Sequence, residues 1–117
     1  MRIAVIGTGV VGCYFGGILS IAGHEVIFCS KGKLIKGIQE SGGLTLSGPR
    51  GTWKVDNCLV TASAEEAVMA DIALSGVKLY DVQDSSSQWH EVIRSAGAVV
   101  SLQNGLCGPD LIRLAVP

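Results

Sequence analysis

Short apolar runs alternate with segments of helical composition along this chain. Arg2–Ile6 and Glu25–Cys29 have apolar residues at successive positions, which is typical of parallel strands covered by helices on both faces. Between them, Val10–Ala22 reads as an apolar helix, and Gly23 follows where a left-handed residue ends a helix. This crossover is too long for a hairpin, so we expect a right-handed βαβ unit with parallel strands.

Strand and helix candidates keep alternating after this first unit. Three further strands are predicted at Leu59–Thr61, Ile72–Val77 and Ala98–Leu102, and a β-hairpin at Leu44–Leu46 and Thr52–Val55. This spacing indicates an α/β fold, a doubly wound, Rossmann-like parallel sheet whose strand order reverses beside the first strand. We treat residues 1–117 as a single domain, because 117 residues is a common domain length.

Each later helix has its own start signal. Ser63 and Glu66 have the spacing of a capping box, which predicts a helix beginning there. Ser85 and Gln88 are the expected cap of another helix, and Pro109 is expected at the first position of the last one. The apolar face of the middle helix is predicted to hold Trp89, Val92, Ile93 and Ala96.

Composition favours a packed protein and argues against a nucleic-acid binder. Hydrophobic residues make up 48% of the chain and charged residues 16%, with a net charge of −1. This excludes intrinsic disorder and leaves no basic excess to displace counterions. The four cysteines, which are spread singly and lack zinc-site spacing, are interpreted as buried reduced thiols of a cytoplasmic protein. They are Cys13, Cys29, Cys58 and Cys107.

The first segment also fits a membrane or secretory interpretation. No charged residue occurs between Ile3 and Gly23, and Gly12 and Gly16 have the GxxxG spacing of membrane helices. However, β-branched residues, a Gly-Thr-Gly turn and a second apolar run follow one another in the order of a strand, a turn and a helix. We therefore expect no membrane association.

A glycine-rich turn joins the first predicted strand to the first predicted helix. It matches G-x-G-x-x-G inside a βαβ unit, which is the context of a dinucleotide fingerprint. Its first glycine permits a sharp turn, its second lets the backbone approach a pyrophosphate, and its third allows close helix–sheet packing. The amides of the turn are expected to bind phosphate, and a purely structural turn is the alternative. The residues are Gly7, Thr8, Gly9, Val10, Val11 and Gly12.

The end of the second strand indicates which dinucleotide binds. NAD sites usually place Asp or Glu there, but this chain has Ser30 and Lys31 and no acidic residue at positions 26–39. Lys31, Lys33 and Lys36 would supply the charge that an adenosine 2′-phosphate requires. We therefore predict NADP as the cofactor, with a solvated face of lysines as the alternative.

Four segments of the chain match one known pattern. They are residues 1–12, Ala22-Gly23-His24-Glu25-Val26, Val77-Lys78-Leu79-Tyr80-Asp81 and Leu102-Gln103-Asn104-Gly105. Together they resemble the N-terminal domain of ketopantoate reductases, the 2-dehydropantoate 2-reductases of pantothenate and coenzyme A synthesis. The resemblance implies an oxidoreductase that reduces a 2-keto acid with NADPH. Many members carry an arginine at or beside position 30, where this chain has Ser30.

The resemblance also implies roles for two polar residues. It places Lys78 and Asn104 at the cofactor and substrate cleft, as catalytic and cofactor-binding residues. Taken by themselves, Lys78 reads equally as a solvated lysine and Asn104 as part of an Asn-Gly turn. Gly9, Ser30, Lys78 and Asn104 all follow carboxyl ends of predicted parallel strands, where ligands bind in open α/β sheets.

Ketopantoate reductases have a second, helical domain that supplies the lysine and the acidic residue of catalysis. This sequence ends at Pro117 without such a domain, so we expect the chain to bind NADPH and a small 2-keto acid but to turn over little alone. We expect a homodimer or another partner to cover the apolar surface that the missing domain leaves. Two alternatives remain: a regulatory module that senses NADPH without chemistry, and a domain whose glycines serve packing only.

Overall fold

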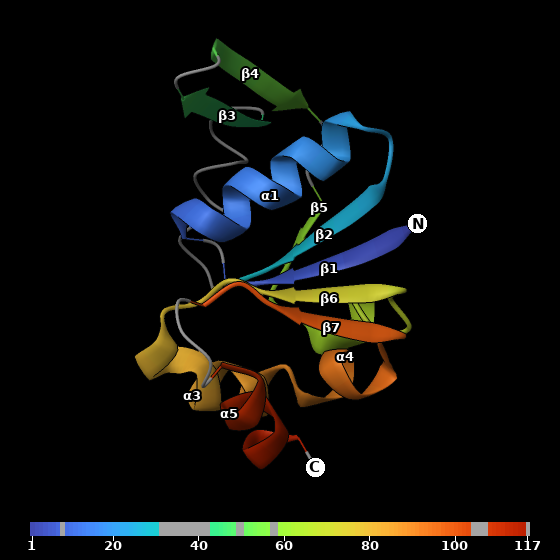
Figure 1. Ribbon diagram of the computed structural model, residues 1–117. Coiled ribbons are helices and arrows are strands. Elements are labelled where there is room, and N and C mark those ends of the chain that lie inside the picture. The colour runs from blue at the N-terminus through green and yellow to red at the C-terminus, as the bar shows by residue number, and fades with distance from the viewer. Residues whose placement is uncertain (8, 31–42, 49–50, 57–58, 104–107, 117) are drawn as a thin grey trace.

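Five parallel strands form the centre of the computed structural model (Figure 1). The structure describes residues 1–7, 9–30, 43–48, 51–56, 59–103 and 108–116. The strand order is β5-β2-β1-β6-β7, and each neighbouring pair is parallel. The predicted doubly wound sheet is therefore confirmed, with the order reversing beside β1. The strands are β1 (Arg2–Ile6), β2 (Glu25–Cys29), β5 (Leu59–Thr61), β6 (Ile72–Ser75) and β7 (Ala98–Ser101).

Helices lie on both faces of this sheet (Figure 1). One face carries α1 (Val10–Ile21), and the other carries α3 (Val82–Gln88), α4 (His90–Ser95) and α5 (Gly108–Ala115). The predicted hairpin is confirmed and lies beyond α1, on the side away from the sheet. Its antiparallel strands, β3 (Gly43–Gly48) and β4 (Gly51–Asp56), are slightly longer than predicted.

Alternate side chains of the central strands enter two separate apolar clusters. Ile3 and Val5 of β1 pack on the α1 side, whereas Ala4 and Ile6 pack on the side of α3, α4 and α5. All four are at most 2% exposed, which explains why β1 is apolar at successive positions. The sheet thus separates two hydrophobic cores.

The helix α1 begins at the predicted residue and ends within one residue of the predicted end. Gly23, with φ +100°, has the left-handed conformation expected after the helix. Gly16 lets α1 approach the sheet, because a β-carbon there would lie 2.6 Å from Cε1 of Phe28. Within the described ranges, none of the helices combines the length and apolar character that a membrane crossing requires.

The segment after β5 is not the predicted α-helix. A single 3-10 turn, η1 (Ala64–Glu66), forms there, and the Ser63 side chain does not cap it. Instead, Thr61 Oγ1 accepts a hydrogen bond from the Ser63 amide at 3.0 Å and donates one to the Ser63 carbonyl at 3.2 Å. The Glu66 carbonyl accepts a hydrogen bond from Arg2 Nη2 at 2.6 Å. The predicted capping box is therefore wrong, because Thr61 Oγ1 takes the Ser63 amide that the Glu66 side chain would accept in such a box.

The next predicted helix begins earlier and is broken in the middle. A 3-10 turn, η2 (Leu79–Asp81), leads directly into α3, so Ser85 lies inside this helix and donates to the Val82 carbonyl instead of capping. Trp89, with φ −102° and ψ 29°, separates α3 from α4 and is 4% exposed. The predicted apolar face is confirmed, but burial of the large indole accompanies a departure from helical geometry.

Three further element boundaries differ by one or two residues from the prediction. The strand β6 stops at Ser75 and β7 stops at Ser101, although the next amides, of Gly76 and Leu102, still bond to the neighbouring strand. The helix α5 begins at Gly108, so Pro109 is its second residue. The segment predicted as a short helix or turn, 31–41, lies outside the described residues.

Candidate functional site

The carboxyl ends of the sheet strands lie in one row. Pairing aligns Thr61, Cys29, Ile6, Ser75 and Ser101 across the five strands. The row is followed by three further backbone hydrogen bonds of 2.8 to 2.9 Å. These join the amide after β2 to the end of β5, the amide after β6 to the end of β1, and the amide after β7 to the end of β6. The loops that follow therefore leave the sheet at one edge, called the carboxyl edge below.

Two glycines of the turn after β1 are required by the protein's own packing. Gly7 has φ +89°, which disfavours any side chain, and a β-carbon there would lie 2.7 Å from the Val77 amide nitrogen. A β-carbon on Gly12 would collide with the Gly7 carbonyl and lie 3.3 Å from Val5 Cγ1. Gly7 thus makes the sharp turn and Gly12 the close helix–sheet contact, as the sequence predicts.

Gly9 differs from both, because nothing in the described part of the chain requires a glycine there. Its φ of −74° and ψ of −167° are accessible to any residue, and a β-carbon would meet no atom of the described residues within 4 Å. Gly9 is also exposed. No described residue therefore fills the space above Gly9, and a side chain there would project into it.

The amino-terminal end of α1 meets that open space. The amide of Cys13 makes the first helical hydrogen bond, to the Gly9 carbonyl at 3.0 Å, so the amides of Val10, Val11 and Gly12 precede the helical ladder. The N-cap residue, Gly9, provides no side-chain cap, and the first turn of the helix contains no acidic residue. This end of α1 can therefore accept an anion, because its amides and the helix dipole both favour negative charge.

The remaining predicted site residues fall into two groups. Ser30 follows β2 and is half-buried, with its amide bonded to the Thr61 carbonyl, while Lys78 follows β6 and is exposed. The structure thus brings the glycine turn, Ser30 and Lys78 to the ends of adjacent strands. Thr8, Lys31 and Asn104 lie outside the described residues, so their predicted roles stay predictions.

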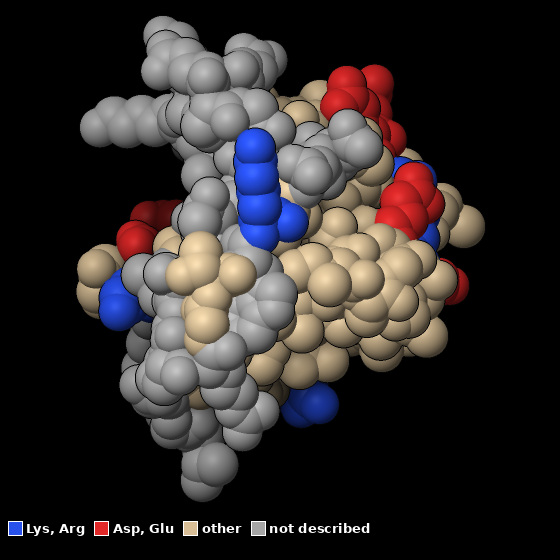
Figure 2. All heavy atoms as spheres, turned by 90° about the horizontal axis from the view of Figure 1, so that it is seen from above, with Lys and Arg blue, Asp and Glu red and all other residues tan. Residues whose placement is uncertain are grey.

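Exposed carboxylates gather at the opposite end of the sheet. Glu25 begins β2, Glu66 ends η1 and Asp71 precedes β6. In the view from above (Figure 2), most of the red acidic atoms accordingly lie on the right, where the N-terminus lies in Figure 1. These charges are therefore distant from the first turn of α1, where a bound anion would meet the helix dipole.

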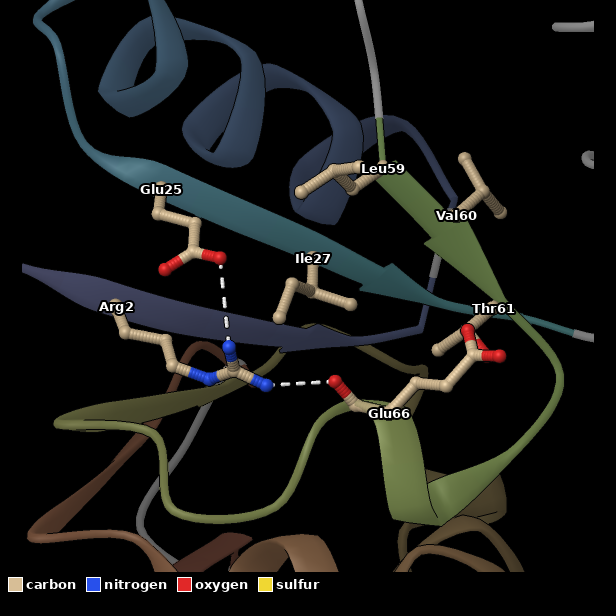
Figure 3. Close-up of a pocket in the computed structure, with 7 residues that line it drawn as sticks. All are labelled: Arg2, Glu25, Ile27, Leu59, Val60, Thr61 and Glu66. Atoms are coloured by element: carbon tan, nitrogen blue, oxygen red, sulfur yellow. Dashed lines mark hydrogen bonds and ion pairs between the residues drawn. The ribbon is translucent and has the colours of Figure 1, made fainter.

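A pocket of about 140 Å³ begins at Arg2 and Glu25 and runs along the edge strand β5. Figure 3 shows the Arg2 guanidinium directed at Glu25, with Nη1 3.4 Å from Oε1, and at the Glu66 carbonyl. The other lining residues are Ile27, Leu59, Val60 and Thr61. Arg2 is engaged by protein groups on two sides and so ties β1 to β2 and η1. The pocket extends along β5 as far as Thr61, at the end of that strand.

The cysteines of the described residues have different environments. Both Cys13 and Cys29 are reduced; Cys29 is buried as predicted, but Cys13 only partly. Burial raises the pKa of the Cys29 thiol from 9.0 to about 12. Cys58 and Cys107 lie outside the described residues, and across the described ranges no group of His, Cys, Asp or Glu side chains is arranged to hold a metal ion.

Sequence reasoning passed over one polar residue of the carboxyl edge. Gln103 stands beside Asn104 in the sequence, and its Nε2 donates to the carbonyl oxygens of Ser75 and Val77 at 2.9 and 3.0 Å. These partners are 26 to 28 residues away along the chain. Only its position directly after a strand could have drawn attention to it.

Comparisons with known proteins agree with this arrangement. The 2-dehydropantoate 2-reductase of Archaeoglobus fulgidus is 32% identical over 95% of this chain and 35% of its own length. The PanE/ApbA family ketopantoate reductase from Ralstonia eutropha JMP134 has a TM-score of 0.86 and 34% identity, over 99% of this chain and 38% of that one. For the 2-dehydropantoate 2-reductase from Geobacter metallireducens GS-15, the TM-score is 0.81 and the identity 26%, over 97% and 37%.

The chain thus spans 35 to 38% of the length of these relatives. Within that span, residues 3–117 match the family described as ketopantoate reductase PanE/ApbA. The match covers the whole chain except its first two residues. The chain belongs to the ketopantoate reductases of the PanE/ApbA type.

Proposed function

We propose that this chain binds NADPH at the carboxyl edge and is the cofactor-binding part of an oxidoreductase. The reaction is the reduction of a 2-keto acid, 2-dehydropantoate, to pantoate. Membership in the ketopantoate reductase family supports the reaction class. When bound, NADPH would supply the hydride, and the keto oxygen would take up a proton.

The observation that carries the proposal is the open space over Gly9. Gly7 and Gly12 are explained by internal packing, but the glycine at position 9 is not. A backbone without a side chain, placed at an uncapped helix N-terminus, fits the close approach of a pyrophosphate. The residues present therefore suit a dinucleotide.

Other residues of the proposed site follow the family pattern. We assign Thr8, Val10 and Val11 to the phosphate-binding turn, and Ser30 and Lys31 to the adenosine 2′-phosphate. Lys78 and Asn104 are proposed to face the nicotinamide and the substrate. We place the proton donor of the reduction in the part of the relatives that this chain does not span. The reduced thiols fit a cytoplasmic location.

Calorimetric titration with NADPH, combined with urea unfolding, tests this proposal through two matched glycines. Gly9→Ala should keep the stability of the wild-type chain, because its β-carbon meets nothing, but should bind NADPH at least about tenfold more weakly. Gly12→Ala should lose about 1–3 kcal/mol of stability through overpacking. Unchanged NADPH affinity in a folded Gly9→Ala chain would show that no pyrophosphate lies there.

The same titration with NADH tests the choice of cofactor. Wild-type chain should prefer NADPH by about ten- to a hundredfold, because one or two charge-assisted hydrogen bonds to the 2′-phosphate are worth that much. Lys31→Glu should remove the preference without weakening NADH binding. An NADPH to NADH affinity ratio that does not change in Lys31→Glu contradicts the assignment of Lys31.

A further inference from the structure

Gln103 reaches from the end of β7 to the loop after β6. Its Nε2 donates to the Ser75 carbonyl at 2.9 Å, to Ser75 Oγ at 3.1 Å and to the Val77 carbonyl at 3.0 Å. Its Oε1 accepts a hydrogen bond from the Ser101 hydroxyl. One side chain thus joins two neighbouring strand ends, and we call this set of contacts the Gln103 clamp.

The partners of Gln103 determine which way its amide points. Ser75 and Val77 present carbonyl oxygens, which only the NH₂ group can satisfy, and a reversed amide would set Oε1 against both. The start of α5 covers the other side, because a β-carbon on Gly108 would lie 2.8 Å from Oε1. The clamp is therefore part-buried, with a protein partner for each end of the amide.

The loop that the clamp holds is also the wall of the glycine turn. A β-carbon on Gly7 would lie 2.7 Å from the Val77 amide nitrogen, and one on Gly76 would lie 3.1 Å from the Gly12 α-carbon. The backbone at positions 76 and 77 therefore touches both packing glycines of the turn. Lys78 is the next residue along this loop.

We propose that Gln103 is a positioning residue of the dinucleotide site. By fixing the Ser75 and Val77 carbonyls, it holds the loop after β6 against the glycine turn and sets where Lys78 leaves the sheet. It makes this contribution through the backbone, without touching the cofactor. The proposal rests on the function proposed above, since it assigns Gln103 to that same site.

Gln103→Met is the variant that tests the clamp, because it keeps the length of the side chain and removes all of its hydrogen bonds. NADPH affinity should fall on the order of ten- to a hundredfold, since loss of preorganisation misplaces the binding groups. Amide exchange measured without nucleotide should accelerate at Gly76 and Leu102, whose hydrogen bonds flank the clamp. The Ser30 amide belongs to the same row but joins β2 to β5, away from the clamp, so it should keep its protection.

Val92→Ala is the matched control, because it removes packing from the fully buried core of α4 and leaves the clamp intact. It should lose global stability while keeping wild-type NADPH affinity. Wild-type affinity in Gln103→Met, or unchanged exchange at Gly76 and Leu102, overturns the proposal. If Gln103→Met does not fold, Gln103→Asn carries the same measurements, because its shorter amide cannot reach both strand ends.

Failure of the proposed function would look different from failure of the clamp. A wild-type chain that binds neither NADPH nor NADH contradicts the proposed function. The exchange rates of Gly76 and Leu102 would then decide alone whether Gln103 fixes the two loops. Faster exchange at these amides in Gln103→Met, with Ser30 unchanged, would still support the clamp, and equal exchange would contradict it.

Discussion

Glycines at the same turn serve different physical needs. Gly7 needs freedom of φ, and Gly12 needs the absence of a β-carbon beside the Gly7 carbonyl. Gly9 meets neither need among the described residues, and the function proposed above assigns it to the approach of a pyrophosphate. At the scale of the residue, the structure therefore explains two glycines of the motif by packing and conformation, and the third is the one that the proposed function explains.

Cys29 offers a pH-dependent test at the same scale. Burial raises its thiol pKa from 9.0 to about 12, so the folded state holds the proton more tightly than the unfolded state does. Its contribution to stability should be fully present below pH 9.0 and be lost as the pH rises towards about 12. The loss should be at most about 1.4 kcal/mol per pH unit.

Urea unfolding of the wild type and Cys29→Ala at several pH values isolates this effect. The difference between their free energies of unfolding should be constant below pH 9.0 and should shrink above it. Groups common to both proteins cancel in the difference. A difference that stays constant up to about pH 12 would mean that the thiol is not desolvated in solution.

At the scale of the element, the turn after β5 has two possible sources of stability, a capping box at Ser63 or the side chain of Thr61. A capping box assigns the stabilising hydroxyl to Ser63, whereas the structure assigns it to Thr61, which is 5% exposed and bonds twice to the Ser63 backbone. Thr61→Val should therefore cost about 1–2 kcal/mol of unfolding free energy. Ser63→Ala should change it by less than about 0.5 kcal/mol.

Chemical denaturation of these two variants measures the contrast directly. If Ser63→Ala were the costly substitution, by about 1 kcal/mol, the capping box would form after all. The physical reason to expect the opposite is that Thr61 Oγ1 already accepts the hydrogen bond of the Ser63 amide, which the Glu66 side chain would accept in a capping box. A short turn anchored from outside has no helix behind it for a cap to stabilise.

At the scale of the whole molecule, the sheet separates two cores that use different side chains. On the α1 side, Gly16 lets the helix pack against Phe28 of the sheet. On the opposite side, the largest buried side chain is that of Trp89, between α3 and α4. Trp89→Ala should reduce the free energy of unfolding by about 3–5 kcal/mol, because it leaves a large cavity under the sheet. The adjacent exposed Gln88→Ala should change it by less than about 0.5 kcal/mol.

The urea midpoint of each variant measures this contrast. Similar midpoints for Trp89→Ala and Gln88→Ala would mean that the cluster beneath the sheet collapses around the missing indole. The expected large loss follows from the position of Trp89, since every helix on that face shares this core with the lower side of the sheet.

Much of the sheet was predictable because its signals are local. The bounds of β1, β2 and β5 and the start of α1 were predicted to the residue, since apolar runs and glycine punctuation act over a few positions. The parallel pairing of β1 with β2 followed from the length of the crossover between them. The conserved geometry of such a unit also placed the glycine turn at the carboxyl edge.

The tertiary structure alone decided the features whose partners are distant in the chain. The Glu66 carbonyl meets Arg2 across 64 residues, and Gln103 meets Ser75 across 28. The break at Trp89 likewise depends on burial among other elements. Local propensity carries no information about such contacts, because a hydrogen bond or a buried face exists only after the sheet has brought its two sides together.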